Sequence, residues 1–389
     1  MTQRDRILAA CRGETPDRIP WVPRMDLWYK ARARTGRLPK PYQDLSLREL
    51  TDALGIGYHA VVPDFRDLRT PEDTVDRGLG IYRLRNMPFE TRLRGISRTV
   101  EQVGDVTRVV YDTPKGRVSC AFSYTEDMKR AGTTIPWVTE HAFKTIEDAP
   151  ALEYIFSHLD VVPTYDGYQE WHDWVGDAGV AVAYGNSGAS PMHHILHDLA
   201  PIEAFFLNLY DYPERMAALA DSMNGWFGQM LNALVGSPAE IVMLGANYDA
   251  ALTSPRFFEA HILPWLAREA EALHRCGKLL LTHTDGENTG LTALYRRSGV
   301  DIADSLSPAP LTKLTLAEAI EQLPGITIWG GIPSVALLSD SMGEREFERF
   351  VDEAVALVFG RTHFILGIAD TTPPEASLDR ILAITERVQ

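Results

Sequence analysis

A short stretch near residue 280 combines the residue types that could do chemistry. Residues 278–282 (Lys-Leu-Leu-Leu-Thr) form an apolar run without helical periodicity, which is typical of a buried parallel strand. His283, Asp285 and Glu287 follow it, and alternating side chains of an extended backbone would project all three the same way. A strand that ends in titratable groups predicts the mouth of an α/β enzyme site. The alternative is a polar loop in which Asp285 or Asn288 caps the next helix.

Two kinds of chemistry suit these residues. His283, Asp285, Glu287 and the later Asp370 could together hold Zn²⁺ or another divalent cation with an open coordination position. Alternatively, clustered carboxylates raise each other's pKa and serve as general acids or bases. The three cysteines are far apart and none stands in a Cys-x-x-Cys arrangement, so histidine and carboxylates would have to supply the ligands.

The elements that must position these side chains alternate along the chain. From residue 146 onward, expected helices separate strands, and two more strands precede them. Strands are predicted near residues 21, 58–62, 179–184, 240–245, 278–282, 301–303, 325–329 and 362–366. Seven or eight strands alternating with helices favour a closed (β/α)8 barrel over an open sheet. We expect one domain spanning residues 1–389.

Residues 91–122 differ from this pattern. Three runs with period-two alternation are separated by turn-forming groups, Gly-Asp at 104–105 and Thr-Pro-Lys-Gly at 113–116. They predict an antiparallel β-meander inserted into the barrel domain.

Polar residues recur directly after the predicted strands, which in a barrel brings them to one face. Capping a helix or a loop is the alternative role for each of them. We expect catalytic roles for His283, Asp285, Asp26 and Asp64. The expected substrate-binding residues are Arg24, Tyr29, Tyr184, Asn186, Asn247, Asp249 and Asp304.

Composition limits the partners. The net charge is −15, from 53 acidic and 38 basic residues, and no basic stripe stands out, which argues against nucleic acid and anionic membrane surfaces. No apolar run is long enough for a membrane span, and the start lacks the apolar core of a signal peptide. With three unpaired cysteines, a reducing cytoplasm is the expected location. No Gly-x-Gly-x-x-Gly or Walker-type motif supports nucleotide binding.

Several motifs resemble the uroporphyrinogen decarboxylase superfamily. They are the opening at residues 6–20, the segment 277–286 with its His-Thr-Asp-Gly, and the closing Phe-Ile-Leu-Gly-Ile-Ala-Asp-Thr-Thr-Pro-Pro at 364–374. Residues 113–116 and 143–148 look like those of its methyltransferase-type members. The resemblance implies a (β/α)8 barrel with its site at the carboxyl ends of the strands.

The superfamily contains two main activities, and the residues discriminate between them. True decarboxylases of this family carry an arginine-rich loop, whereas residues 23–30 hold Arg24 alone, which suits a substrate with many carboxylates poorly. The other members are zinc methyltransferases that work with corrinoid proteins through a His-x-Cys motif and a later cysteine. His283 matches that histidine, Asp285 stands at the cysteine position, and the later cysteine is missing. An oxygen-rich site, with or without zinc, would suit an ether, amine or alcohol.

The leading hypothesis is a methyltransferase or demethylase that moves a methyl group between a small O- or N-methylated substrate and a corrinoid (cobalamin) carrier, which a partner protein could bear. The first alternative is a cofactor-independent decarboxylase or lyase on a small carboxylic acid, with Asp26 or Asp64 stabilising a protonated intermediate. The second is a non-catalytic small-molecule binder. A homodimer fits the base rate for such proteins.

Overall fold

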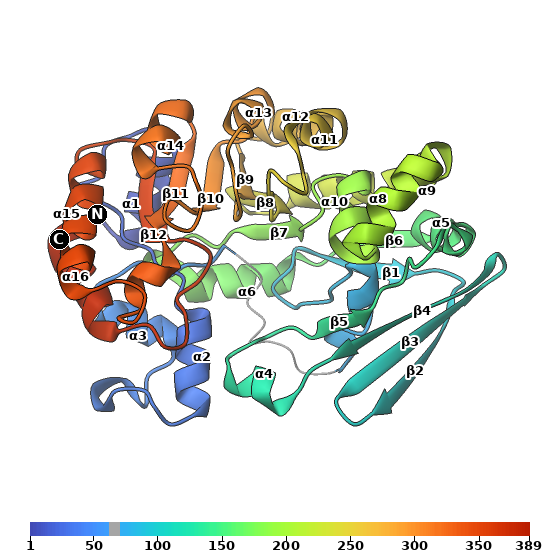
Figure 1. The fold of residues 1–389 in the computed structure, drawn as a ribbon, viewed down its shortest axis with the longest axis horizontal. Helices are drawn as coiled ribbons and strands as arrows, with labels where there is room; N and C mark the ends of the chain where they lie inside the picture. The colour runs from blue at the N-terminus through green and yellow to red at the C-terminus, as the bar shows by residue number, and fades with distance from the viewer. Residues whose placement is uncertain (62–70) are drawn as a thin grey trace.

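A six-stranded parallel sheet forms the centre of the protein (Figure 1), in a computed structural model that describes residues 1–61 and 71–389. Its strands lie in the order β12-β11-β10-β9-β8-β7. Their bounds are β7 (Ala183–Asn186), β8 (Ile241–Ala246), β9 (Leu279–His283), β10 (Ile302–Leu306), β11 (Thr327–Ile332) and β12 (Phe364–Ile368). Every residue of β8, β10, β11 and β12 is buried, which explains their nearly continuous apolar sequences.

Two extended segments outside the named strands link the edges of this sheet. Trp21 pairs in parallel with Leu366 of β12, and the Gly57 N–H donates to the Trp21 carbonyl at 2.9 Å. The Val182 N–H, just before β7, donates to the Ala60 carbonyl at 3.0 Å. The predicted α/β fold with a parallel sheet is confirmed. Complete eight-stranded closure, and a single domain over residues 1–389, stay predictions.

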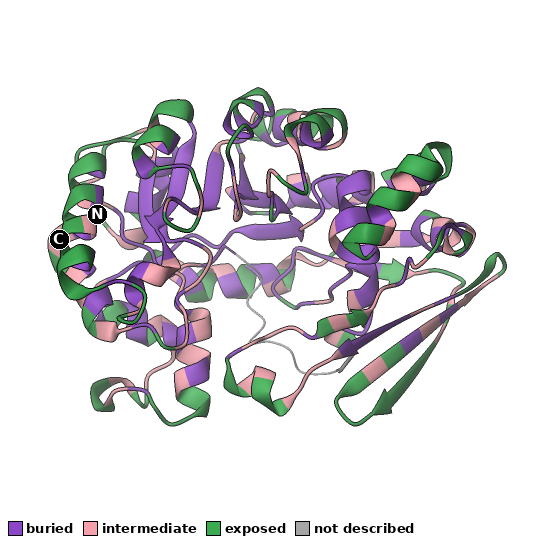
Figure 2. Cartoon of the chain, viewed as in Figure 1, coloured by how far each residue is buried: buried purple, intermediate pink, exposed green. Residues whose placement is uncertain are grey.

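Helices cover the outside of the sheet. Those that follow its strands are α10 (Asn224–Gly236), α12 (Leu263–His274), α13 (Thr292–Arg297), α14 (Leu316–Gln322), α15 (Glu344–Val358) and α16 (Leu378–Val388). The helix α15 shows why: its buried residues Phe347, Val351, Ala354 and Val358 recur every three or four positions and form one apolar stripe. Figure 2 shows the consequence, with buried strands at the centre and exposed outer faces on the helices.

The other helices lie in the N-terminal half of the chain and in the connections on either side of β8. They are α1 (Gln3–Cys11), α2 (Asp26–Arg34), α3 (Leu47–Ala53), α4 (Glu126–Arg130), α5 (Ala149–Ser157), α6 (Tyr165–Val175), α7 (Pro191–His194), α8 (Ile202–Asp211), α9 (Pro213–Ser222) and α11 (Pro255–Phe257). Single π-helical turns, Ile195–Leu199 and Phe258–Ile262, follow α7 and α11. Among the described residues, no helix combines the length and the apolar character that crossing a membrane requires.

A separate antiparallel sheet projects beside the parallel one (Figure 1). Its order is β2 (Ser97–Val103), β3 (Val106–Thr113), β4 (Gly116–Ser123) and β5 (Trp137–Glu140). The predicted bounds 91–122 need correction at both ends. Residues 91–93 belong to β1 (Phe89–Leu93), which pairs with β6 (Leu159–Pro163), and β5 extends the sheet to residue 140. The four residues of β5 follow α4 and are too few for a clear alternation.

Candidate active site

Strand register brings His283 and Asp304 together. They are the last aligned pair of the parallel strands β9 and β10, so their side chains leave the sheet at the same level. The His283 Nδ1–H donates to Asp304 Oδ2 at 2.7 Å, and both side chains are buried. This bond assigns a proton to Nδ1 and directs Nε2 towards the strand ends.

Around His283 Nε2 lies a group that could hold a metal ion. One ligand atom each from His283, Asp285 and Asp370 can be chosen so that all three lie within 4.8 Å of one another. Nε2 is 3.7 Å from Asp370 Oδ1, and the Ser307 hydroxyl donates to Asp285 Oδ1 at 3.2 Å. One nitrogen and two oxygen ligands, with further positions left for substrate, fit a borderline or hard divalent cation.

An irregular backbone holds Asp370. It follows β12 with a φ of 55°, and Ser305, at a bulge of β10, has a φ of 63°. The Asp370 N–H donates to the Ser305 hydroxyl, so each left-handed residue fixes the other. Such conformations are unfavourable for residues with a side chain and often occur at functional sites.

Arg24 connects two carboxylates from opposite ends of the chain. Its Nε donates to Asp26 Oδ1 at 3.1 Å, and its Nη1 donates to Asp370 Oδ1 at 3.0 Å. Asp26 is the first residue of α2, directly after the segment that pairs with β12. Of the four predicted catalytic residues, His283, Asp285 and Asp26 are thus brought to one region. Asp64 lies outside the described residues.

Burial and neighbouring charges act in opposition on these groups. Burial lowers the pKa of His283, but its hydrogen bond to Asp304 and the nearby Asp370 carboxylate outweigh this and raise the pKa to about 9. Burial raises the pKa of Asp370, but His283 and Arg24 bring it to about 2. For Asp285, burial and the nearby Asp370 carboxylate raise the pKa. The cluster therefore holds an imidazolium, ionised carboxylates and one carboxyl group that retains its proton more readily.

No sequence pattern singled out His59, which the structure places next to Asp304. Its Nε2 is 3.4 Å from Asp304 Oδ1, the oxygen that His283 does not use. Its ring meets the buried Trp329 ring edge-on, with centroids 5.2 Å apart. His59 lies in the predicted strand 58–62, but only knowledge of which strands are neighbours would have directed attention to it.

A second hydrogen-bond network begins at the exposed Asn247, a predicted substrate-binding residue, and leads inward to the buried Asp198. The Asn247 N–H donates to the His283 carbonyl at 3.0 Å, and its Nδ2 is 3.1 Å from His197 Nε2. His197 Nδ1 in turn is 3.0 Å from Asp198 Oδ2, and Arg77 donates to the other Asp198 oxygen at 3.0 Å. His197 and Asp198 lie in the π-helical turn, which no sequence pattern indicated.

Other predicted substrate-binding residues form structural hydrogen bonds. The Tyr184 hydroxyl lies 2.8 Å from Ser187 Oγ, the buried Asn186 amide lies 3.2 Å from His194 Nδ1, and the Tyr29 hydroxyl donates to the Leu45 carbonyl at 2.8 Å. These contacts satisfy the polar groups internally, so they offer less to a ligand than the His283 cluster does.

Glu287 and Asp249 stabilise loops. Glu287 accepts the Thr289 N–H at 2.9 Å and the Lys313 N–H at 2.8 Å, and it is not part of the group that could hold a metal. Asp249 accepts the Ala251 N–H at 2.8 Å and the Glu287 N–H at 3.2 Å. The predicted same-side projection of His283, Asp285 and Glu287 fails at the third residue because β9 ends at His283 and Gly286 turns the chain with a φ of 116°.

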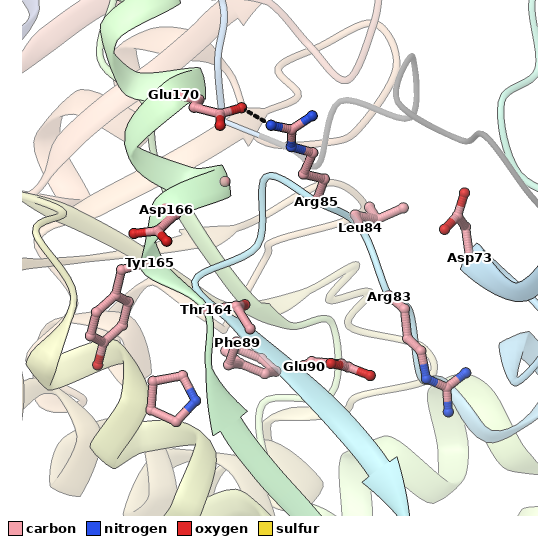
Figure 3. A pocket seen from close by; sticks show the side chains of 12 residues that line it. Asp73, Arg83, Leu84, Arg85, Phe89, Glu90, Thr164, Tyr165, Asp166 and Glu170 are labelled. Atoms are coloured by element: carbon pink, nitrogen blue, oxygen red, sulfur yellow. Dashed lines mark hydrogen bonds and ion pairs between the residues drawn. The ribbon is translucent and has the colours of Figure 1, made fainter.

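A cavity of about 750 Å³ lies elsewhere, between the β1–β6 pair and the start of α6 (Figure 3). Arg85 and Glu170 form an ion pair across one wall, and Thr164, Asp166 and Phe89 line the rest with other residues. None of the predicted site residues lines it, so the cluster at the strand ends remains the candidate active site.

Comparisons with known proteins concern the family and the fold of the chain. A sequence model of the uroporphyrinogen decarboxylase (URO-D) family matches residues 198–389. This range includes β8 to β12 and the residues His283, Asp285 and Asp370. The predicted resemblance is therefore confirmed over residues 198–389, which are similar in sequence to the uroporphyrinogen decarboxylase family.

A solved structure shares the fold over the full length. A methyltransferase from Methanosarcina mazei superimposes with a TM-score of 0.54, covering 100% of this chain and 98% of that chain, at 14% sequence identity. No curated protein is significantly similar in sequence. The structural similarity thus also covers the N-terminal half, where the sequence match does not reach.

Proposed function

We propose that this protein is a metal-assisted methyltransferase that moves a methyl group between a small O- or N-methylated substrate and a corrinoid carrier borne by a partner protein. The observation that carries the proposal is the His283–Asp285–Asp370 group, with Asp304 fixing the imidazole from behind. The superfamily match and a structural neighbour that is named a methyltransferase support the same class of reaction.

The fold indicates where the substrate and the corrinoid would approach the site. We take the parallel sheet as the core of a (β/α)8-type barrel, with the segments around Trp21 and Gly57 completing the ring. In such a barrel the carboxyl ends of the strands form the entrance, so substrate and the carrier's corrinoid would both approach the face that holds His283 and Asp370.

The donor set fits a divalent cation. A cation would displace the Nε2 proton of the His283 imidazolium, and Nε2 could then bind it because Nδ1 is committed to Asp304. Asp285 and Asp370 offer carboxylate oxygens. Two carboxylates in place of thiolates favour oxygen-preferring and borderline ions, Zn²⁺ included, over soft ones. When bound, such an ion would polarise the heteroatom that carries the methyl group.

The chain's own residues would manage position and protons. A corrinoid cobalt supplies the chemistry that accepts the methyl group. The heteroatom that loses a methyl group gains electron density and needs a proton or a positive neighbour. Burial raises the pKa of Asp285, so a cation that binds its carboxylate would displace a proton, which could pass to this heteroatom. Arg24 keeps Asp370 ionised and directed at His283.

The proposal is tested by metal content and by corrinoid-dependent demethylation. Protein purified without chelators should contain about one equivalent of a divalent metal, and His283→Ala and Asp370→Ala should lose it. Glu287→Gln is the matched control, since this neighbouring carboxylate only caps its loop. Methoxylated and N-methylated compounds should methylate cob(I)alamin in the presence of wild type. Turnover of a small carboxylic acid without corrinoid would instead favour the lyase alternative.

A further inference from the structure

Asp304 is bound on both carboxylate oxygens by histidines. His283 Nδ1 lies 2.7 Å from Oδ2, and His59 Nε2 lies 3.4 Å from Oδ1, while Asp304 itself is 1% exposed. We propose that His59 is a positioning residue of the metal site, which acts through Asp304 to hold His283 ready for the cation. This inference rests on the proposed function, because it assigns a role within the same site.

The role follows from how a carboxylate is fixed. The carboxylate torsion of an aspartate is soft, so one hydrogen bond leaves the group free to rotate. A second donor on the other oxygen fixes its plane. Since Asp304 in turn orients the His283 ring, His59 determines where His283 Nε2 points. The Thr284 N–H and hydroxyl bind only the Asp304 backbone carbonyl, at 2.7 and 2.9 Å, so they leave the carboxylate unconstrained.

Packing alone does not account for a histidine here. The His59 side chain is 6% exposed, and its Nδ1 is buried with no hydrogen-bond partner in the described part of the chain. A buried polar atom without a partner destabilises the folded state. A phenylalanine would keep the edge-on contact with Trp329 without this unsatisfied nitrogen. The nitrogen that does have a partner is the one that meets Asp304, which identifies the function of the ring.

The test compares three variants in full-length protein by their affinity for Zn²⁺ and the visible spectrum of their Co²⁺ forms. His59→Phe keeps the ring and removes the donor, so Zn²⁺ should bind about tenfold more weakly or worse, with an altered Co²⁺ spectrum. His59→Gln places an amide N–H near the position of Nε2, so its affinity should stay within about threefold of wild type. His59→Asn, an amide too short to reach Asp304, should behave like His59→Phe and replaces it if that variant does not fold.

Two results would overturn the inference. One is His59→Phe or His59→Asn binding Zn²⁺ as wild type does, with an unchanged Co²⁺ spectrum. The other is equal weakening in His59→Gln and His59→Phe, which would show that the donor is irrelevant. Failure of the proposed metal site looks different, because wild type itself would then bind neither ion and His283→Ala would change nothing.

Discussion

Asp370 and Ser305 hold each other in left-handed backbone conformations, through a hydrogen bond from the Asp370 N–H to the Ser305 hydroxyl. One residue follows β12 and the other lies in the bulge of β10, so the bond joins the ends of two strands that are separated by β11. It places the Asp370 carboxylate beside His283. The structure therefore uses unfavourable backbone conformations to position a proposed metal ligand.

Substitutions at Ser305 separate the loss of this hydrogen bond from the strain of the left-handed backbone. Ser305→Ala removes the acceptor and keeps the strained φ, which should destabilise the protein by about 1–3 kcal/mol and weaken Zn²⁺ binding. Ser305→Gly removes the same acceptor but tolerates the positive φ, so it should be about 1 kcal/mol more stable than Ser305→Ala. Urea unfolding and Zn²⁺ titration measure both quantities. Tighter Zn²⁺ binding in either variant would contradict the positioning role of the bond.

Asp285→Cys restores the His-x-Cys pattern of the zinc methyltransferases that the sequence resembles. Because Asp285 lies in the group that could hold a metal, its replacement by a thiolate should strengthen Zn²⁺ binding. The Co²⁺ form should then gain a thiolate-to-cobalt charge-transfer band. The same substitution at the neighbouring loop carboxylate, Glu287→Cys, provides the control and should give no such band. Absence of this band from the Co²⁺ form of Asp285→Cys would show that residue 285 does not bind the metal.

The buried Glu269, which lies outside the candidate active site, should make the stability of the protein depend on pH. This carboxyl group on α12 is 1% exposed, its Oε2 has no partner among the described residues, and burial raises its pKa to about 8 against the opposing effect of Arg268. A folded pKa above the unfolded one means that the native state holds the proton more tightly. The contribution of Glu269 to the free energy of unfolding is therefore fully present below about pH 4.5. It is lost as the pH rises through about 8, at up to about 1.4 kcal/mol per pH unit.

Glu269→Gln should abolish this loss. The variant should be more stable than wild type at pH 8.5 and should differ less at pH 5, as measured by urea unfolding at both values. Glu271→Gln is the control on the same helix, because Glu271 is exposed and pairs with Arg275. Parallel pH profiles for wild type and Glu269→Gln would rule out the buried carboxyl group as the cause.

Asp198 should be essential for folding stability. It is 3% exposed and its carboxylate accepts from Arg77 and His197, so Asp198→Ala leaves a largely buried guanidinium without its counter-charge. The expected loss is about 3–5 kcal/mol in the free energy of unfolding. Asp173→Ala, at an exposed pair with His172, should change it by less than about 1 kcal/mol. Comparable losses in both variants would refute the assignment.

Features that local sequence patterns encode were predicted, whereas contacts between residues far apart in the sequence were not. The apolar runs of β8 to β12 are local and were predicted, as were His283 and Asp370 at strand ends. The two histidine contacts of Asp304 join β9 and the segment after Gly57 to β10, and nothing in the local pattern encodes such pairings.

Local signals also failed where a turn or a π-helix intervened. Glu287 was predicted as a metal ligand because strand alternation would place it on the same side as His283. The strand β9 ends at His283, four residues earlier, and Gly286 then turns the chain. His197 and Asp198 depend on the π-helical turn after α7, which has no sequence periodicity of its own. Tyr184 and Asn186 were placed correctly at the end of β7, but their polar groups bind the protein itself.

The most direct test of the central claim is the stoichiometry and affinity of divalent metal in wild type, His283→Ala, Asp370→Ala and Glu287→Gln. It is measured by elemental analysis of protein purified without chelators and by Zn²⁺ titration. The proposed site predicts about one equivalent in wild type and Glu287→Gln, and a loss of at least about 100-fold in affinity in the other two. Wild type without metal and without Zn²⁺ affinity, or equal binding in all four proteins, would contradict it.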